Sequence, residues 1–391
     1  TALDYAEKYH IGYYVECFDI DAELGTHTTD FPLEDMKLNT ENGEAMLDNL
    51  VQEITKNGQR KSFIGFHGYD EPFTKQLDNI GVLTEKFYSL CEKKGYNYDI
   101  FMNMNGYWAN ENNFWGYSDP LAYDEYLNLA FLEASPRMLS VTQYPYVQPD
   151  TKEETITALM YDRLSTYRDY SKKYGVPFWR MLQAGGQWND EQAWIQSTDP
   201  YPSEGELLFD VNMALTYGAK AIQYFPLVQP IFFSYQEGYT YDFTNRNGLI
   251  GADGNLTRWY YYAKRANTQV QAVDHVLMHS NSERVIVHGK SAIENIITKG
   301  KPGNDIYSDG GYKELKSIKG DDCVVGCFDY KGGTALYVTN YNRTDKADIV
   351  LNFTNKNYMY EIIQRGESIK VKGNKIPLTL DAGEGALIVL A

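Results

Sequence analysis

The sequence predicts an α/β fold in which a (β/α)8 barrel precedes a small all-β sandwich. Apolar strand-like runs alternate with amphipathic helical segments six or more times, which favours a closed parallel barrel over an open sheet. After His279 helical periodicity disappears and short alternating runs follow. A chain of 391 residues is long enough for both parts. We therefore expect a barrel over residues 1–281 and a sandwich over residues 282–391.

The barrel part opens with a helical segment over residues 2–9, and a strand begins at His10. The later strands are expected at Phe63–Tyr69, Tyr98–Met104, Met138–Tyr144, Val176–Gln183 and Ala219–Phe225, with a short eighth strand at Gly248–Gly251. The intervening helices are expected at Ala45–Lys56, Asn79–Lys94, Leu121–Leu132, Thr155–Tyr174, Glu204–Tyr217 and Leu256–His279. These are seven strands, one fewer than a (β/α)8 barrel needs. Either the first barrel strand lies upstream of Thr1, or the missing strand comes late in the chain or has an irregular sequence pattern.

The C-terminal part consists of short runs with period-two alternation, separated by turns such as Lys331-Gly332-Gly333. Strands are expected at Arg284–His288, Cys323–Tyr330, Thr334–Tyr341, Ala347–Phe353, Met359–Arg365 and Ala386–Leu390. Cys323 and Cys327 stand four apart in one of them. Extended geometry separates such residues by roughly 13 Å, so we expect no disulfide between them.

Composition restricts the partners. A formal net charge of -17 repels phosphate backbones and anionic lipid head groups, which argues against nucleic acid and membrane surfaces. No apolar run of roughly 18 residues could span a membrane. With 34 Tyr, 17 Phe and 6 Trp, the chain instead suits neutral ligands such as sugars, whose C–H faces stack on aromatic rings. Oligomeric state is left open.

Cofactor motifs are missing from the sequence. No G-x-S-x-G elbow, Walker loop or G-x-G-x-x-G follows a predicted strand, so we expect no cofactor. His275 and His279 share a helix face without a neighbouring Glu ligand, which favours a solvated helix end over a metal site. We therefore expect no metal.

The stretch FIGFHGYDEPF, from Phe63 to Phe73, ends a strand in two adjacent carboxylates. Working residues of an α/β barrel lie at the carboxyl ends of its strands. Period two places Gly65, His67, Tyr69 and Glu71 toward the barrel axis, and Ile64 and Phe66 toward the helices. Asp70 then points away, although Gly68 and Pro72 permit a bend that would bring both carboxylates into one pocket.

Other strand ends and the loops after them also carry polar or aromatic groups. Glu16 would face inward in the first strand, where an unpaired carboxylate is costly unless it is functional. The further candidates for substrate contact are Asn103, Asn105, Tyr107, Trp108, Gln143, Tyr144, Gln183, Trp188 and Tyr224. The alternative for the amides is that they line a wet barrel mouth, and for the tryptophans that they pack their loops.

Glycosidic bond cleavage requires an acid for the leaving oxygen and a second group that stabilises or attacks the oxocarbenium-like centre. Glu71 is the best acid, because aromatic neighbours and the Asp70 charge raise a carboxyl pKa. The second group remains open among Asp70, Glu16, Glu204 and Glu206. Ser203 followed by Glu206 also fits a helix capping box, which is the competing explanation for that pair.

The DEP segment at 70–72 with Gly65 and Gly68 before it, MNMNGYW at 102–108, QYP at 143–145 and ALTYGAKAIQYF at 214–225 resemble bacterial (β/α)8 glycoside hydrolases that degrade polysaccharides. The terminal LDAGEGALIVL is similar to the end of the β-sandwich that such enzymes carry. The resemblance implies a hydrolase of the cell surface or a secreted one. The start at Thr1 suggests a trimmed or mature form and does not distinguish this location from the cytoplasm.

Two mechanisms within that group compete. The adjacent acids are similar to barrel hexosaminidases, including family 123, which implies that Asp70 steers a 2-acetamido group and Glu71 is the acid. In the retaining β-galactosidase and cellulase clan, a nucleophilic Glu ends the seventh strand, but AIQYFPLVQP carries no carboxylate there. A carbohydrate-binding barrel without catalysis is the chief rival, and a purely structural subunit is the third alternative.

Overall fold

The computed structural model describes residues 2–16, 41–72, 74–106, 122–146, 151–185, 202–228, 248–251 and 254–390. By the density of its internal contacts the chain divides into two compact units, Thr1–Thr142 and Gln143–Ala391. Within the described ranges, no helix has the length and apolar character needed to cross a membrane.

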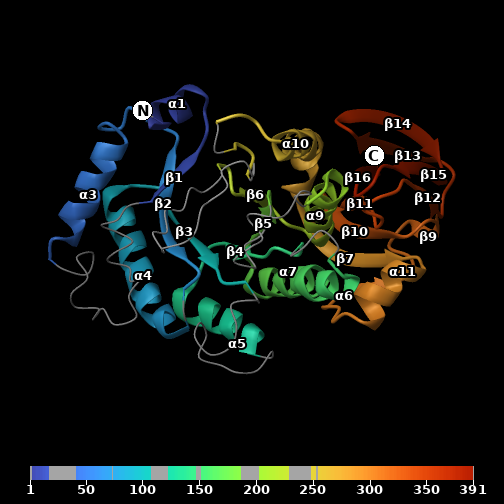
Figure 1. Cartoon of the computed structure of the whole chain (residues 1–391), viewed down its shortest axis with the longest axis horizontal. Coiled ribbons are helices and arrows are strands. Elements are labelled where there is room, and N and C mark those ends of the chain that lie inside the picture. The colour runs from blue at the N-terminus through green and yellow to red at the C-terminus, as the bar shows by residue number, and fades with distance from the viewer. Residues whose placement is uncertain are drawn as a thin grey trace, which may run out of the picture. The chain divides into compact units, whose positions relative to one another are not determined.

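The first unit contains four parallel strands in the order β1-β2-β3-β4. These are β1 (Tyr13–Glu16), β2 (Phe63–Asp70), β3 (Asp99–Met104) and β4 (Leu139–Thr142). The helical segments are α1 (Ala2–Lys8), α3 (Gly43–Ile54), η3 (Thr74–Gln76), α4 (Leu77–Lys94), α5 (Ala122–Leu129) and the π-helical turn η4 (Ala130–Ala134). Figure 1 shows α4 running alongside β2 and β3.

Helix α4 follows from its apolar spacing. Ile80, Leu83 and Phe87 recur at helical intervals and are buried, and Gly95 ends the helix in the left-handed conformation that glycine adopts without a steric penalty. Phe87 contacts Phe66 of β2 edge to face, with ring centroids 5.9 Å apart. Phe66 therefore faces the helical layer, as period two predicts.

Gly65 allows β2 and β3 to approach each other closely. A Cβ atom built at this position would lie 2.0 Å from the carbonyl oxygen of Asp99. Only glycine fits there. The glycine at position 65 is therefore explained by the close packing of β2 against β3.

The second unit begins with a helical layer and two more parallel strands. The helical segments are α6 (Glu153–Ile156), η5 (Thr157–Tyr161), α7 (Asp162–Tyr174), α9 (Glu204–Tyr217) and α10 (Arg258–Leu277). The strands β5 (Phe178–Gln183) and β6 (Ala221–Phe225) pair in parallel. The expected strand at Gly248–Gly251 is reduced, in the described residues, to bridges from Ile250 to Val228 and Leu256.

Two antiparallel sheets complete this unit, one of seven strands in the order β14-β13-β16-β11-β10-β7-β8 and one of three in the order β15-β12-β9. Within the larger sheet, only the pair β7–β8 is parallel. Six strands match expectation: β7 (Ser280–His288), β10 (Cys323–Tyr330), β11 (Gly333–Asn340), β12 (Ala347–Phe353), β13 (Tyr358–Gln364) and β16 (Gly385–Leu390). Short helical turns α11 (Lys290–Ala292) and η6 (Ile293–Thr298) follow β7.

Four strands were not predicted: β8 (Ile306–Ser308), β9 (Leu315–Gly320), β14 (Glu367–Gly373) and β15 (Lys375–Leu380). They are short, charged or interrupted by proline, so their apolar signal is weak. Strand β14 is mostly exposed and lies at a sheet edge, where lysines are common. Pro377 in β15 also obscures the pattern.

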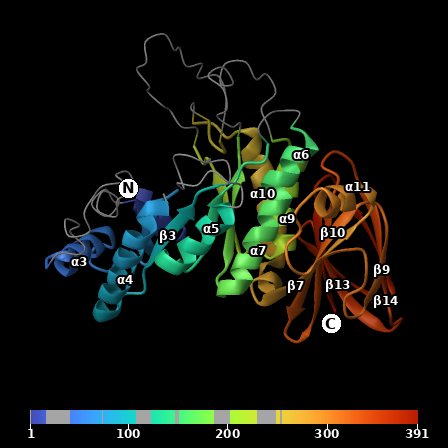
Figure 2. The ribbon, with the colours of Figure 1, turned by 90° about the horizontal axis from the view of Figure 1, so that it is seen from below.

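Helix α9 is the centre of the second unit. Twelve of its residues are buried, from Gly205 through Leu207–Tyr217, because it packs on β5 and also on β10 and β11. Figure 2 shows α9 and α10 beside the sandwich. The predicted boundary at residue 281 stays a prediction. Cys323 and Cys327 are buried free thiols, so the expectation of no disulfide between them is confirmed.

Candidate active site

A β-bulge at Gly68 changes the facing of the last residues of β2. His67 pairs with Phe101 of β3, but Tyr69 pairs with Met102, so Gly68 is an extra residue between them. One extra residue turns each following side chain to the opposite face. Asp70 thereby joins the inner face that His67 occupies. Tyr69 lies on the helix side and is fully buried, which corrects its predicted inward, substrate-binding position.

Asp70 lies beside Asn103 on the neighbouring strand. The Asn103 Nδ2 donates to Asp70 Oδ1 at 2.8 Å and to Thr142 Oγ1 at 2.5 Å. Its Oδ1 accepts a hydrogen bond from Ser140 Oγ at 3.0 Å. Asn103 is 1% exposed, so one buried carboxamide connects β2, β3 and β4. It positions Asp70, whose own side chain is exposed.

Glu71 has a left-handed backbone, with φ of 49°. Its N–H donates to the carbonyl of Asn103 at 2.8 Å, and its own carbonyl accepts from Asn105 Nδ2 at 3.0 Å. These bonds maintain a conformation that costs roughly 1–3 kcal/mol for a residue other than glycine. The side chain of Glu71 forms a hydrogen bond with Thr142. Both carboxylates therefore reach the inner face, and the predicted bend near Gly68 is present as a bulge.

Tyrosines of α5 fix the segment that follows Glu71. The Tyr126 hydroxyl donates to the carbonyl of Pro72 at 2.8 Å and accepts from the N–H of Asn105 at 3.3 Å. The Tyr123 hydroxyl donates to the carbonyl of Asn105 at 3.2 Å. Asn105 is 0% exposed, so it acts as a positioning residue in this structure.

The pKa of the Glu71 carboxyl is raised, and burial is the largest cause. Desolvation and then the charge of Asp70 raise the pKa of the Glu71 carboxyl to about 7, against the hydrogen bond from Thr142, which lowers it. A carboxyl with this pKa is substantially protonated at neutral pH and can donate a proton. Asp70, more exposed, supplies the neighbouring charge.

The remaining predicted residues of the first unit are His67, Glu16, Tyr107 and Trp108. His67 stacks on Phe101 with ring centroids 5.3 Å apart, on the inner face. Glu16 pairs with His67 in register across β1 and β2, and its side chain lies outside the described part. Tyr107 and Trp108 lie outside the described residues, as does Trp188 of the second unit.

Two predicted amides of the second unit have structural partners. Gln183 is buried and its side chain bonds the backbone of Tyr146 in both directions, at 3.2 and 2.8 Å. Gln143 is also buried: its side-chain Oε1 accepts from the Tyr167 hydroxyl at 3.4 Å, and its backbone carbonyl accepts from Arg180 at 2.8 Å. Arg180 in turn forms a buried ion pair with Asp210 of α9. These amides maintain the local fold of their strand ends.

Glu206 has a capping role. Its carboxylate accepts from the N–H of Ser203 at 2.8 Å, while the Ser203 hydroxyl accepts from the N–H of Glu206 at 3.3 Å. This capping box begins α9. The capping box, which the sequence offered as the competing explanation for Glu206, is therefore observed. Glu204 pairs with Arg265 at 3.0 Å.

Two predicted tyrosines of the second unit remain partly accessible. Tyr144 stacks on Phe225 with ring centroids 5.8 Å apart and planes 16° from parallel. Phe225 is 45% exposed, so this pair presents an aromatic surface. Tyr224 donates to Asn267 at 2.8 Å.

Sequence reasoning missed Ser140, Thr142 and Tyr126. Period two in β4 does place Ser140 and Thr142 on one face, so the two hydroxyls could have been found by treating this strand as β2 was treated. The role of Tyr126 could not be predicted, because a tyrosine on an apolar helix face has the same sequence pattern as an ordinary core residue. Within the described residues, no three His, Cys, Asp or Glu side chains converge in a way that could hold a metal ion.

Comparisons with known proteins bear on the fold. No protein-family model and no curated protein matches the sequence. Among solved structures, the chain is similar to Gan42B, a GH42 β-galactosidase, with a TM-score of 0.51 and 8% identity over 90% of this chain and 82% of that one. A catalytic mutant of Gan42B from G. stearothermophilus gives a TM-score of 0.52 at the same identity and coverage. The predicted fold class, a TIM barrel followed by a β-sandwich, is confirmed.

We predict that Glu71→Gln stabilises the protein in a pH-dependent manner. The folded-state pKa of about 7 lies above the usual 4.5, so the carboxyl carries no penalty below about pH 4.5; the penalty grows between pH 4.5 and 7 and is constant above that range. The variant should be more stable by about 1–3 kcal/mol above pH 7 and equal to the wild type near pH 4. Urea denaturation across this range measures the difference.

Glu125, an exposed residue of α5, is the matched control for that experiment. Glu125→Gln should change the free energy of unfolding by no more than about 0.5 kcal/mol at any pH. A Glu71→Gln protein that loses stability at pH 8 would contradict the raised pKa and indicate a structural carboxylate.

Proposed function

We propose that this protein is a glycoside hydrolase in which Glu71 is the general acid. The observation that carries the proposal is the pair of carboxylates on one inner face, with Glu71 buried enough to have a pKa of about 7 and Asp70 more exposed beside it. Two carboxyl groups with different environments are what acid-assisted glycosidic cleavage requires. The left-handed backbone at Glu71 supports this, because strained residues concentrate at functional sites.

Asp70 is the partner that we assign to Glu71. Among the described residues, it is the carboxylate whose charge acts on the Glu71 pKa. With an adjacent Asp in that place, a substrate bearing a 2-acetamido group supplies its own nucleophile. Glu71 gives its proton to the glycosidic oxygen, the acetamido oxygen attacks the anomeric carbon, and Asp70 accepts a hydrogen bond from the acetamido N–H. Water then opens the cyclic intermediate, with the Glu71 carboxylate taking its proton.

Carbohydrate is the substrate class that we propose. The chain is acidic, at a formal net charge of -17, which disfavours polyanionic substrates. The stacked pair Tyr144–Phe225 offers an accessible aromatic surface of the kind on which sugar rings stack. Gan42B, which is similar in fold, is described as a β-galactosidase. We also propose that the protein acts outside the cytoplasm, as the resemblance to polysaccharide-degrading enzymes implies.

The leaving-group dependence of Glu71→Gln tests the acid role. We expect kcat to fall by about 10²–10⁴ on natural oligosaccharides, whose departing alcohol needs protonation, and by much less on dinitrophenyl glycosides, whose phenolate leaves unassisted. Wild-type kcat should also fall as pH rises through about 7, where Glu71 loses its proton. Steady-state kinetics on both substrate classes measures the loss.

Equal losses on the two classes would contradict general-acid catalysis. Binding of oligosaccharides without any turnover by the wild type would instead favour a carbohydrate-binding barrel without catalysis.

Asp70→Asn separates the two mechanisms. If Asp70 orients an acetamido group, the variant should lose about 10²-fold or more of kcat on N-acetylhexosaminides. The corresponding hexosides lack the acetamido nucleophile, so they should be poor substrates of the wild type and the variant alike. Kinetics with paired aryl substrates that differ only at C2 checks this. A loss that does not depend on the C2 substituent would count against substrate assistance.

A further inference from the structure

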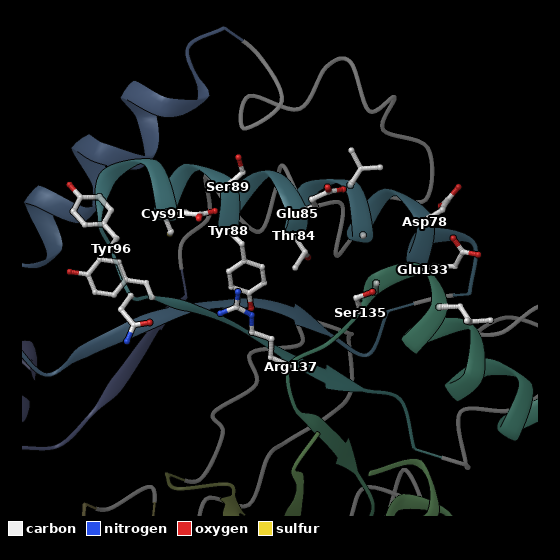
Figure 3. A pocket seen from close by; sticks show the side chains of 17 residues that line it. Asp78, Thr84, Glu85, Tyr88, Ser89, Cys91, Tyr96, Glu133, Ser135 and Arg137 are labelled. Carbon is white, nitrogen blue, oxygen red and sulfur yellow. The ribbon is translucent and has the colours of Figure 1, made fainter. Parts of the chain in front are cut away.

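A groove of about 1050 Å³ lies in the first unit, on the side of the sheet that α4 covers. Its walls are α4, the segment that leads from η4 to β4, and the residues before β3 (Figure 3). The groove shares no lining residue with the carboxylate site built on Asp70, Glu71 and Asn103. It is therefore a separate feature of the same unit.

Arg137 presents its hydrogen-bond donors to this groove. Its guanidinium lies 3.5 Å from the centroid of the Tyr88 ring, and Tyr88 is itself anchored by a hydrogen bond to Asp99. Within the described part of the chain, the guanidinium makes no hydrogen bond or ion pair, and Arg137 is exposed. A stacked guanidinium is held flat with its five N–H donors directed outward. It is oriented for a ligand with oxygen acceptors.

Thr84 provides a second, independent observation. Its side chain lines the groove and is 3% exposed, yet its hydroxyl has no hydrogen-bond partner among the described residues. Figure 3 shows Thr84 and Tyr88 both directed from α4 toward the side of Arg137. Buried polar groups normally have a partner, so an orphan hydroxyl at a groove wall indicates that something else pairs with it.

The rest of the lining decides the ligand class. Four carboxylates and two hydroxyls also line the groove, and they belong to Asp78, Glu85, Glu92, Glu133, Ser89 and Ser135. Anions would be repelled by the four carboxylates, and cations would meet Arg137. A neutral polyol can bind both the Arg137 donors and the carboxylate acceptors, because each of its hydroxyls donates and accepts. Val82 and Leu132, which are 43% and 60% exposed, offer apolar surface for C–H faces.

From these observations we propose that the groove is a second binding site for a neutral saccharide. The choice of a saccharide among neutral polyols rests on the proposed function, and the site deepens that function by giving the enzyme a hold on a long glycan away from the reacting bond. Arg137 donates to ring or hydroxyl oxygens, Thr84 pairs with one hydroxyl, and the rim carboxylates accept from others.

Affinity electrophoresis of the full chain tests the proposal. Native gels contain soluble galactan, xyloglucan, galactomannan or starch, and the protein carries Glu71→Gln to prevent digestion. We expect at least one polysaccharide to slow migration, and Arg137→Ala to weaken this binding at least fivefold. Arg258 also stacks an exposed guanidinium on an aromatic ring, Trp259, so Arg258→Ala is the matched control and should bind normally.

Thr84→Val distinguishes a binding role from a structural one. Valine has the shape of threonine without the orphan hydroxyl, so the variant should unfold at the same or a higher temperature while its polysaccharide affinity falls about threefold. In a protein with Glu71 intact, Arg137→Ala should cleave small aryl glycosides at the wild-type rate.

Three results would overturn the groove proposal. They are the absence of retardation by every neutral polysaccharide, retardation that survives both Arg137→Ala and Thr84→Val, and Arg137-dependent retention by polygalacturonate instead. Failure of the wild-type protein to cleave aryl glycosides would contradict the proposed hydrolase function, not the groove proposal. If that occurs while Arg137-dependent retardation persists, the hydrolase function is wrong and the groove still binds saccharide.

Discussion

The hydrogen bonds of the Asn103 side chain are the interaction on which the candidate site depends. This buried carboxamide connects Asp70 at the end of β2 with Ser140 and Thr142 of β4. An unpaired amide at this depth is costly, so its three partners fix one another's positions. The backbone carbonyl of Asn103 also receives the N–H of Glu71. The same residue therefore positions one carboxylate through its side chain and the other through its main chain.

The backbone geometry of residues 68–71 explains how the adjacent residues Asp70 and Glu71 can share one face of a strand. In a regular strand Asp70 and Glu71 would point to opposite sides. The bulge at Gly68 turns Asp70 inward, and the left-handed backbone at Glu71 ends the alternation one residue later. Two irregularities in four residues place both acids together, with Glu71 partly buried and Asp70 exposed. This difference in exposure is the basis on which we propose separate roles for the two carboxyl groups.

Local patterns predicted most of the fold, because helical and strand periodicities are properties of short segments. Helix α9, β10 and β12 begin and end where the sequence places them. The DEP segment was also predicted as the candidate site, and the structure places both of its carboxylates together. What the sequence could not supply was register: whether Gly68 forms a bulge depends on how β2 pairs with β3, and this decides the facing of Tyr69. Ser140 and Thr142 follow a readable alternation, whereas Tyr126 acquires its role only through tertiary contact with Pro72 and Asn105.

Glu71 should hold a proton near neutral pH because it is partly buried beside Asp70. Carbon-13 NMR of the Glu71 carboxyl, assigned by its absence in Glu71→Gln and followed from pH 4 to 9, measures this directly. We expect a midpoint near 7 in the wild type and a lower midpoint in Asp70→Asn, where the neighbouring charge is gone. A midpoint near the ordinary 4.5 that does not move in Asp70→Asn would contradict this expectation.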